Sequence, residues 1–389
     1  MKFKISLSPL KKVLPYLSII LFLIVVIYTS YLYYQNSKLV GERDQSIATI
    51  QKISSELNTL KTQDPYKTNS ELKKEIEDIQ KTFSLAVSTY ESLLDLETPP
   101  KNIKGLDELF ANILVLLGKR DYTEAVKKLS ELSIKIREEQ TKIATAVIIP
   151  QNIPVSNTTP ESGYSRQKVT TEAGDFQVDI IAADLSSTRI IVDTASDSTC
   201  VNDCPVLPLA TYVSRSGAYA GVNGSYFCPA TYPTCSDKTN SFDTLLMNKN
   251  KTWFNSDNNV YSTNPGVVFE GSRVNFVSAV SQVGRDTGID GMISNYPLLV
   301  SGSNISFGGD DDPKKGSKGA RSFVANKGSI VYIGVVHNAT VAESARVMRA
   351  LGMENALNLD NGGSTALWSG GYKVGPGRNI PNVILFVKK

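Results

Sequence analysis

Histidine is almost missing from this sequence, and its net charge is small. His337 is the single histidine among 389 residues, which weakens any mechanism that needs a histidine base or a multi-histidine metal site. The formal net charge is +3, from 41 lysines and arginines against 38 acidic residues, so nothing favours nucleic-acid binding. We therefore expect no nucleic acid as a partner, no bound metal ion and no cofactor.

Cysteine is scarce as well, and the four cysteines lie close together at Cys200, Cys204, Cys228 and Cys235. Their C-x3-C and C-x6-C spacings differ from the paired C-x2-C knuckles that are usual in zinc sites, although a zinc site is the alternative. Disulfides are favoured if this domain lies outside the cytosol. We expect neighbours to pair, Cys200 with Cys204 and Cys228 with Cys235, but spacing alone does not fix the connectivity.

Charge is absent between Val13 and Tyr34, where the sequence is almost wholly apolar. This length matches the ~20 residues that a helix needs to cross a bilayer. Lysines precede the stretch and acidic residues do not, so the positive-inside rule leaves the N-terminus in the cytoplasm and exports the rest. A cleaved signal peptide is the alternative, but its apolar core should be shorter and end in small residues. The pattern favours a single-pass membrane anchor over residues 1–36, with the C-terminal domain outside the cytoplasm.

Residues 37–147 have the spacing of amphipathic helices. Apolar side chains recur at steps of three and four residues along one helix face, at Leu72, Ile76, Ile79, Phe83, Val87, Tyr90 and Leu94. We expect a helical, coiled-coil-like stalk or a small bundle, with self-association through these helices left open. A partner-binding module is the alternative. Residues 148–168 contain three prolines among polar residues, a composition typical of a linker.

Residues 169–389 change to short runs rich in β-branched side chains, such as Ile190–Val192 and Val331–Val336. One clear helix interrupts them, from near Thr340 to near Gly352. Because strands outnumber helices, the sequence predicts an α+β domain built on a mixed β-sheet.

A strand followed by Asp360-Asn361-Gly362-Gly363-Ser364-Thr365 is the most informative stretch. Glycines allow positive φ, and they let a turn direct several backbone N–H groups toward one point, where an anion can bind. Asp360 would then lie at the edge of that site. The alternative is a hairpin turn in which the Asp360 carboxylate accepts hydrogen bonds from turn N–H groups.

Two further stretches contain candidate site residues. Asn223 and Gly224 end a strand and lead into Tyr226 and Phe227, which would offer a hydroxyl contact and a surface for stacking a sugar. An Asn-Gly turn beside core aromatics is the alternative. Arg321 lies at the start of another strand, where its planar guanidinium suits a bidentate phosphate contact, unless it is an ordinary surface arginine.

Together these stretches resemble the phosphodiester glycosidase family. That family shows an N-G-G-Y-F-like segment, a strand with P-R-T-A, and a helix followed by N-L-D-G-G-G-S. The counterparts here are residues 223–227, Arg321 with Ser322, and residues 358–364. Asparagine, serine and tyrosine replace some of the family's glycines, and His337-Asn338 stands where the family usually has Asp-Gly.

The resemblance implies cleavage between the anomeric carbon of a sugar and a phosphate oxygen. A phosphate is already a good leaving group, so charge neutralisation by Arg321 and the turn N–H groups matters more than a proton. Asp360 would act as a base, a nucleophile or an electrostatic partner of the sugar cation. His337 is a further candidate for substrate contact, or else it only holds a loop.

The apolar N-terminal stretch and the family resemblance together predict a membrane-anchored hydrolase acting on a sugar-1-phosphodiester in envelope or extracellular polysaccharide. A non-catalytic module that binds glycan or a phosphodiester polymer is the second interpretation. An envelope scaffold that acts through its helices is the third.

Overall fold

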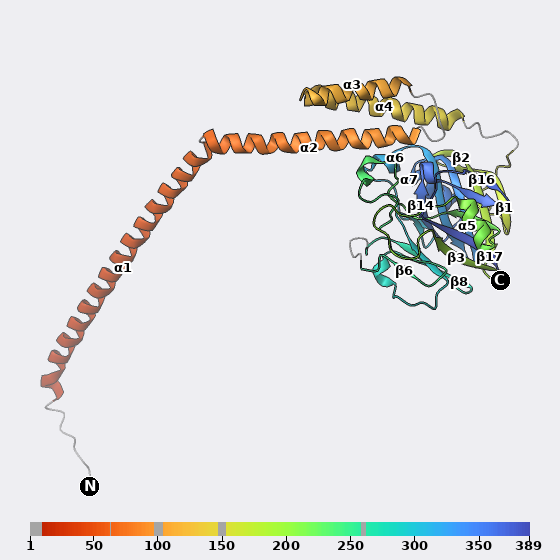
Figure 1. The fold of residues 1–389 in the computed structure, drawn as a ribbon. Coiled ribbons are helices and arrows are strands. Elements are labelled where there is room, and N and C mark those ends of the chain that lie inside the picture. The colour runs from red at the N-terminus through yellow and green to blue at the C-terminus, as the bar shows by residue number, and fades with distance from the viewer. Residues whose placement is uncertain (1–9, 63, 97–103, 147–152, 258–261) are drawn as a thin grey trace, which may run out of the picture. The chain divides into compact units, whose positions relative to one another are not determined.

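The computed structural model describes residues 10–62, 64–96, 104–146, 153–257 and 262–389. The chain divides into two compact units, Met1–Gln80 and Lys81–Lys389, which are treated separately below. Figure 1 shows the helices of the N-terminal part and the strands of the C-terminal part, coloured along the chain.

The first unit contains helix α1, Leu10–Thr62, and the beginning of α2, which spans Asp64–Leu96. Apolar side chains of α1 are exposed from residue 21 on. Among the stretches with described side chains, no helix combines the length and apolar character that crossing a membrane requires. The span predicted from Val13 begins outside those stretches. The structure therefore does not confirm the predicted transmembrane helix, and it gives no support for a coiled coil.

The second unit begins with a small helical bundle. The end of α2 packs with α3, Lys104–Gly118, and α4, Tyr122–Ala146, around one apolar core. The rings of Tyr90 and Phe110 stack at 5.0 Å in this core. Asp121 begins α4 by accepting a hydrogen bond from the backbone N–H of Glu124, because the first N–H groups of a helix have no partner within it.

The strands that follow form three sheets. The largest has the order β1 (Gly163–Thr171), β2 (Gly174–Asp184), β13 (Ile330–Ala339), β12 (Gly319–Lys327), β14 (Asn355–Asn361), β10 (Leu298–Ser301) and β11 (Asn304–Ile305). We call it the large sheet. Strand β1 starts at Gly163, inside the range predicted as a linker. Within the same range, Val155 forms an isolated β-bridge with Lys168.

Each of the other two sheets has five strands. The second has the order β16 (Tyr372–Val374), β15 (Leu367–Ser369), β4 (Ala220–Asn223), β17 (Asn382–Lys388) and β3 (Thr188–Thr194). The third has the order β6 (Trp253–Phe254), β5 (Leu246–Met247), β9 (Gly291–Ser294), β7 (Gly266–Glu270) and β8 (Arg273–Val277). Helices α5 (Leu209–Ser216), α6 (Pro313–Gly316) and α7 (Val341–Ala350) lie between strands in the sequence.

The prediction of a mixed sheet is wrong, since every pairing within these sheets is antiparallel. Helix α7 connects β13 to β14. The two strands do run the same way, but β12 lies between them and pairs antiparallel with both. The broader prediction, helices first and then an α+β domain, is confirmed.

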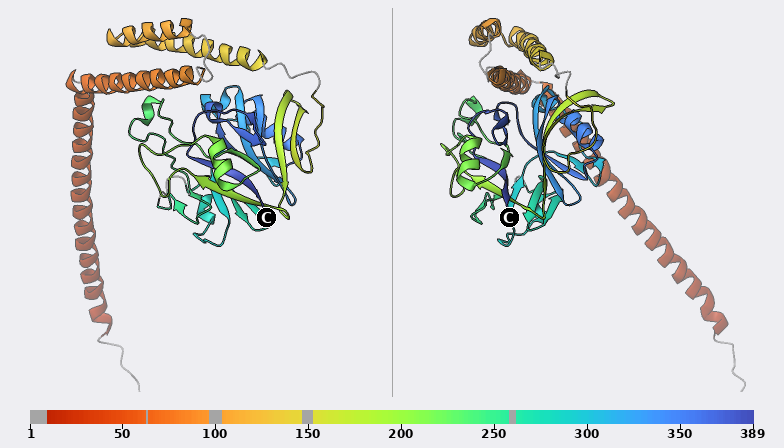
Figure 2. Two further views of the ribbon diagram at one scale, coloured as in Figure 1. Left: turned by 45° about the vertical axis from the view of Figure 1, so that its right-hand side comes forward. Right: turned by 90° about the vertical axis from the view of Figure 1, so that its right-hand side faces the viewer.

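Apolar side chains from all three sheets form the main core, which includes Ile181, Val192, Val222, Phe269 and Ile384. The opposite face of the large sheet is covered by α7 through Val341, Ala345 and Met348, and the second sheet is covered by α5. Figure 2 shows the strands as facing layers with these helices outside them. At the centre of the large sheet, the ends of β13, β12 and β14 lie side by side.

Both predicted disulfides are present. Cys200 bonds to Cys204 and Cys228 bonds to Cys235, with Cα–Cα distances of 5.7 and 5.3 Å. No cysteine is left for a zinc site.

Gly334 of β13 is a site where backbone approach demands glycine. A Cβ there would lie 2.4 Å from the carbonyl oxygen of Asp179 and 2.7 Å from the ring of Phe323. We predict that Gly334→Ala lowers the free energy of unfolding by about 1–3 kcal/mol through overpacking. Gly316→Ala is the control, because a Cβ at Gly316 meets nothing within 4 Å. Urea unfolding of both variants checks this, and an unchanged midpoint for Gly334→Ala would contradict it.

Candidate functional site

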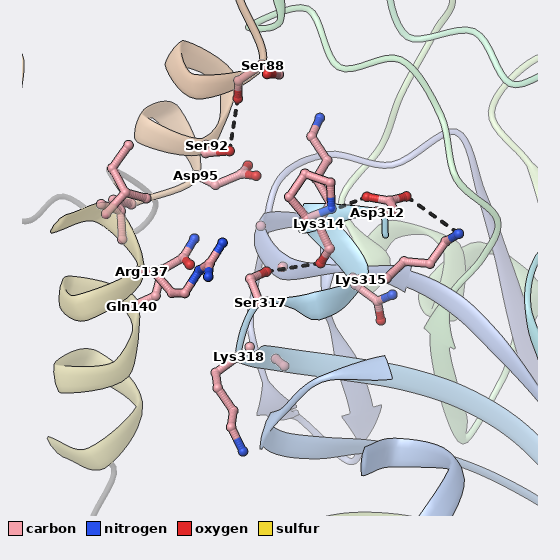
Figure 3. Close-up of a pocket in the computed structure, with 18 of the residues that line it drawn as sticks. Ser88, Ser92, Asp95, Arg137, Gln140, Asp312, Lys314, Lys315, Ser317 and Lys318 are labelled. Carbon is pink, nitrogen blue, oxygen red and sulfur yellow. Dashed lines mark hydrogen bonds and ion pairs between the residues drawn. The ribbon is translucent and has the colours of Figure 1, made fainter. Parts of the chain in front are cut away.

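A cavity of about 840 Å³ lies within the second unit, at the ends of β12, β13 and β14, which are central strands of the large sheet. This volume is in the range of small-molecule binding sites. One side is formed by the helical bundle and the other by the loop of residues 312–318 (Figure 3). Both predicted catalytic residues, Arg321 and Asp360, line this one cavity. So do His337 and the turn of residues 361–364.

Asn223 lies beneath the cavity and is fully buried. Its Nδ2 donates to the carbonyl oxygen of Asp360 at 2.7 Å. Its Oδ1 accepts from Ser322 Oγ at 2.7 Å and from the backbone N–H of Ala366 at 3.1 Å. The Asn223 amide therefore joins β4, β12 and the end of β14, and the sequence analysis had expected it to contact substrate instead.

Gly224 is needed where the chain leaves β4. A Cβ at this position would lie 1.9 Å from Oδ1 of Asn382, which accepts the backbone N–H of Ser225 at 2.8 Å. Like Asn223, Gly224 supports the site without lining the cavity. Thr365, another residue predicted to bind substrate, is also buried and outside the lining.

Aromatic rings form one wall of the cavity. Tyr226, Phe227 and Tyr296 line it, and the rings of Tyr226 and Tyr296 lie 5.1 Å apart. The hydroxyl oxygen of Tyr226 accepts from Asn358 Nδ2 at 2.7 Å and from Asn361 Nδ2 at 3.1 Å. Burial raises the pKa of Tyr226, so its hydroxyl stays protonated. The ring is thus fixed, as a stacking surface for a sugar requires.

Asp360 lies at the floor of the cavity, with only 9% of its surface exposed. Burial raises the pKa of its carboxyl group to about 6, although a hydrogen bond from Ser364, the charge of Arg378 and the N–H of Asn361 oppose the rise. That N–H donates to Asp360 Oδ1 at 2.8 Å. The chain then turns at Gly362, where φ is +61°. Asp360 is therefore a buried acid that ionises near neutral pH.

Arg321 faces the cavity, but most of its guanidinium is engaged elsewhere. Nε donates to the carbonyl oxygen of Ala339 at 2.8 Å, and Nη2 donates to the carbonyl oxygens of Lys314, at 3.1 Å, and Ser317. Burial lowers the pKa of this group. These contacts fix the loop of residues 314–317 and leave Nε and Nη2 without capacity for the predicted bidentate phosphate contact.

Arg378 is a cation of this cavity that the sequence analysis missed. Its backbone N–H donates to the carbonyl oxygen of Gly363 at 2.8 Å, and its guanidinium packs so closely on Gly363 that a Cβ would lie 2.4 Å from Nη2. Nη2 also donates to Asp95 of α2 at 3.2 Å. No motif surrounds Arg378, so only the folded chain reveals that it lies beside the turn after Asp360.

The helical bundle contributes two acids near the cavity, Asp95 in its lining and Glu91 behind it. Asp95 accepts from the hydroxyl of Tyr232 at 2.6 Å, and Glu91 accepts from Lys314 Nζ at 2.9 Å and from Thr234 Oγ1. Figure 3 shows Ser88, Ser92 and Asp95 of α2 on the side opposite the loop that carries Lys314 and Lys315. The end of α2, which the sequence analysis read as part of a stalk, is therefore a wall of the cavity.

His337 lies at the end of β13 and contacts a second buried acid that sequence reasoning missed. Its Nε2 is 2.6 Å from Asp179 Oδ2. Asp179 also accepts from Tyr164 Oη at 2.5 Å and from Arg166 Nε at 2.7 Å. Burial disfavours the Asp179 carboxylate, but the hydrogen bonds from His337, Arg166 and Tyr164 outweigh it and hold the pKa of Asp179 below its usual value.

Comparison with protein families gives one match: the phosphodiester glycosidase model matches residues 216–387. The match confirms the resemblance predicted from the motifs. The search of curated proteins found no match to this chain.

Several solved structures match this chain, among them the following three. A hypothetical protein from Synechocystis is 15% identical, with a TM-score of 0.41 over 58% of this chain and 62% of its own. The zebrafish N-acetylglucosamine-1-phosphodiester alpha-N-acetylglucosaminidase catalytic domain, auto-inhibited by its pro-peptide, is 14% identical, with a TM-score of 0.44 over 61% and 87%. A putative exported protein from Burkholderia pseudomallei is 11% identical, with a TM-score of 0.37 over 55% and 74%.

The raised pKa of Asp360 has a consequence for stability. The pKa of Asp360 rises from 3.8 in the unfolded chain to about 6 in the fold, so ionising this group destabilises the folded state by roughly 3 kcal/mol. This destabilisation is absent below about pH 4, where the group is protonated in both states, and reaches its full value above about pH 6. We predict that Asp360→Asn, which stays neutral, is more stable than the wild type at pH 7 and that this gap closes near pH 4. Urea unfolding at both pH values checks this, with the exposed Asp197→Asn as the control. A gap that does not change with pH would contradict the assignment.

Proposed function

We propose that this chain, whose residues 216–387 form a phosphodiester glycosidase domain, hydrolyses the bond between an anomeric carbon and a phosphate in sugar-1-phosphodiesters. The observation that carries the proposal is Asp360, a buried carboxyl group at the floor of a cavity that also holds arginines. An anionic diester suits the cations, and a sugar that gains positive charge at its anomeric carbon suits the carboxylate.

Asp360 has the acidity that this chemistry needs. A carboxyl group with a pKa of about 6 is ionised at neutral pH and still basic enough to accept a proton. In the reaction, Asp360 is a base for water, a nucleophile, or the negative charge that stabilises the sugar cation. Its hydrogen bonds with Asn361 and Ser364 hold the carboxylate in one orientation for any of these roles.

Arg378 is the best-placed group to neutralise the leaving phosphate. It lies against the turn after Asp360, and its partner Asp95 lies on the exposed side of the cavity. Arg321 contributes positive charge from below while its hydrogen bonds hold the loop of residues 314–317. A phosphate group can exchange for the Asp95 carboxylate on Arg378, since guanidinium binds both anions in the same geometry.

The aromatic wall suits the sugar ring. Tyr226 and Tyr296 offer fixed faces, and the amides of Asn358 and Asn361 next to them hold the ring of Tyr226 in place. A pyranose has apolar C–H faces that pack on such rings, while its hydroxyls bind polar groups at the edge. Tyr296 stands where the family has glycine, so it narrows the sugar-binding part of this cavity.

The protein acts outside the cytoplasm, anchored through its N-terminal segment, on a substrate in envelope or extracellular polysaccharide. The uncharged stretch from Val13 to Tyr34 and the lysines before it support this location. The two disulfides support it independently, because such bonds persist in oxidising compartments. A mature N-terminus beyond Tyr34, found by sequencing the protein isolated from its membrane fraction, would instead indicate a cleaved signal peptide.

The function can be tested with chromogenic sugar-1-phosphodiesters. We predict turnover by the wild type, with kcat/KM about 10²–10³-fold lower in Asp360→Asn and in Arg378→Ala, since each removes one electrostatic contact to the transition state. Arg273→Ala, an exposed arginine on β8, is the matched control and should be unaffected. Binding of the diester without turnover by the wild type would overturn the proposal in favour of a non-catalytic binding module.

Arg321 and Arg378 should differ in their effect on stability. Arg321→Ala leaves the carbonyl oxygens of Ala339 and Ser317 without their donor, which we expect to lower the free energy of unfolding by about 1–3 kcal/mol. Arg378→Ala should cost less, because its partner Asp95 is 28% exposed and keeps the hydrogen bond from the hydroxyl of Tyr232. Urea unfolding of both variants measures the difference, and equal midpoints would show that Arg321 does not hold the loop.

A further inference from the structure

We infer that His337 is the general base of this site and that Asp179 positions it. The ring nitrogen Nδ1 of His337 takes the proton from the water that attacks the anomeric carbon. This inference rests on the proposed function and deepens it, because it assigns the proton transfer to a residue other than Asp360. It also reverses the expectation that a sequence with one histidine uses no histidine base.

Asp179 fixes which nitrogen of His337 carries the proton. The carboxylate is fully buried, ionised and therefore only an acceptor. Nε2 of His337, 2.6 Å from Asp179 Oδ2, must then be the N–H nitrogen of the neutral ring. This leaves the lone pair on Nδ1, so the two ring nitrogens have exchanged roles relative to Ser-His-Asp hydrolases, in which the acid holds Nδ1–H and Nε2 is the base.

The carboxylate of Asp179 cannot turn away from the ring. Tyr164 Oη and Arg166 Nε donate to Oδ1, and Arg166 Nη2 donates to Oδ2 at 3.1 Å. Arg166 also neutralises Asp179 and is itself held by the carbonyl oxygen of Lys373 at 3.3 Å. Asp179 therefore accepts three hydrogen bonds before His337 is counted. The contact with His337 adds a fourth, and it orients the imidazole ring against a carboxylate that is already held in place.

His337 faces the same cavity as Asp360. Its side chain is 17% exposed, and Nδ1 makes no hydrogen bond to any residue that the structure describes. Strand β12 separates the strands that carry the two residues, which places their backbones about 10 Å apart by ordinary strand spacing. The cavity of about 840 Å³ that both residues line has room for a sugar phosphate and a water molecule.

Asn338, the residue after His337, has an unpartnered acceptor. Its φ is +51°, a left-handed conformation that asparagine adopts more readily than most residues. Its Oδ1 is buried and has no partner among the described residues, although the residue lines the cavity. A buried acceptor without a donor is a group that a bound water molecule satisfies, and this one lies in the residue next to the proposed base.

The step balances as follows in atoms and charge. The water oxygen forms a bond to the anomeric carbon as the bond from that carbon to the phosphate oxygen breaks. The electron pair of the broken bond leaves with the phosphomonoester, and the water proton moves to Nδ1 of His337. Asp179 stabilises the resulting imidazolium, which then releases its proton to solvent. Asp360 remains the negative charge that faces the sugar cation.

Replacing the base should be detectable with azide, a nucleophile that has no proton to remove. We expect His337→Gln to lower kcat by about 10²–10⁴-fold and azide to restore part of it with formation of a glycosyl azide. Asp179→Asn should show a smaller loss of the same kind. Tyr219→Phe, which removes a hydrogen bond to Thr188 Oγ1 and does not line the cavity, is the control and should retain its activity.

The single histidine allows a second test that does not depend on turnover. In the ¹⁵N-histidine NMR spectrum of the full chain without added histidines, every signal comes from His337. We expect the neutral ring to be the Nε2–H tautomer and Asp179→Asn to mix the two tautomers.

Three results would overturn the inference: an Nδ1–H tautomer in the wild type, unchanged kcat in His337→Gln, or a loss that azide does not restore in the folded variant. Failure of the wild type to turn over any sugar phosphodiester would instead reject the proposed function.

Discussion

The site depends on one buried amide. Asn223 donates to the carbonyl oxygen of Asp360 and accepts from Ser322 and Ala366, so a single side chain joins the ends of three strands. Buried polar groups are costly unless they are satisfied, and here each hydrogen bond requires the others to be in register. The sequence segments around residues 223, 322 and 360 are thus one hydrogen-bonded unit, although they lie far apart in the sequence.

Two buried aspartates meet opposite environments on either side of β12. The burial of Asp360 outweighs the hydrogen bonds and the charge of Arg378 that oppose it, so the pKa of its carboxyl group rises to about 6. Asp179 receives hydrogen bonds from three side chains and keeps its charge. When environments push similar groups apart in this way, they can take different tasks in one reaction. A carboxylate that is permanently ionised can hold a partner, and one that titrates near neutral pH can face a developing charge.

Local patterns in the sequence predicted what local forces decide. The expectation that neighbouring cysteines pair is confirmed, although spacing alone did not fix the connectivity, and residues 321 and 360, which the motifs singled out, line one cavity. Arg378 and Asp179 could not be found this way, because no pattern of neighbours marks them and only long-range packing brings them to the cavity. The mixed sheet was predicted wrongly for a related reason: which strand inserts between β13 and β14 is a property of the whole sheet.

The family match begins at residue 216, yet several residues and strands that support the cavity come earlier in the sequence. Strand β2, which carries Asp179, sits between β1 and β13, and β3 is the edge partner of β17. Asp95 and Glu91 come from still earlier in the chain. A recombinant fragment trimmed to the matched residues would lack β2, so the backbone groups of β13 that pair with β2 would have no partner. His337 would also lose its contact with Asp179. For this protein the catalytic unit is larger than the recognisable domain.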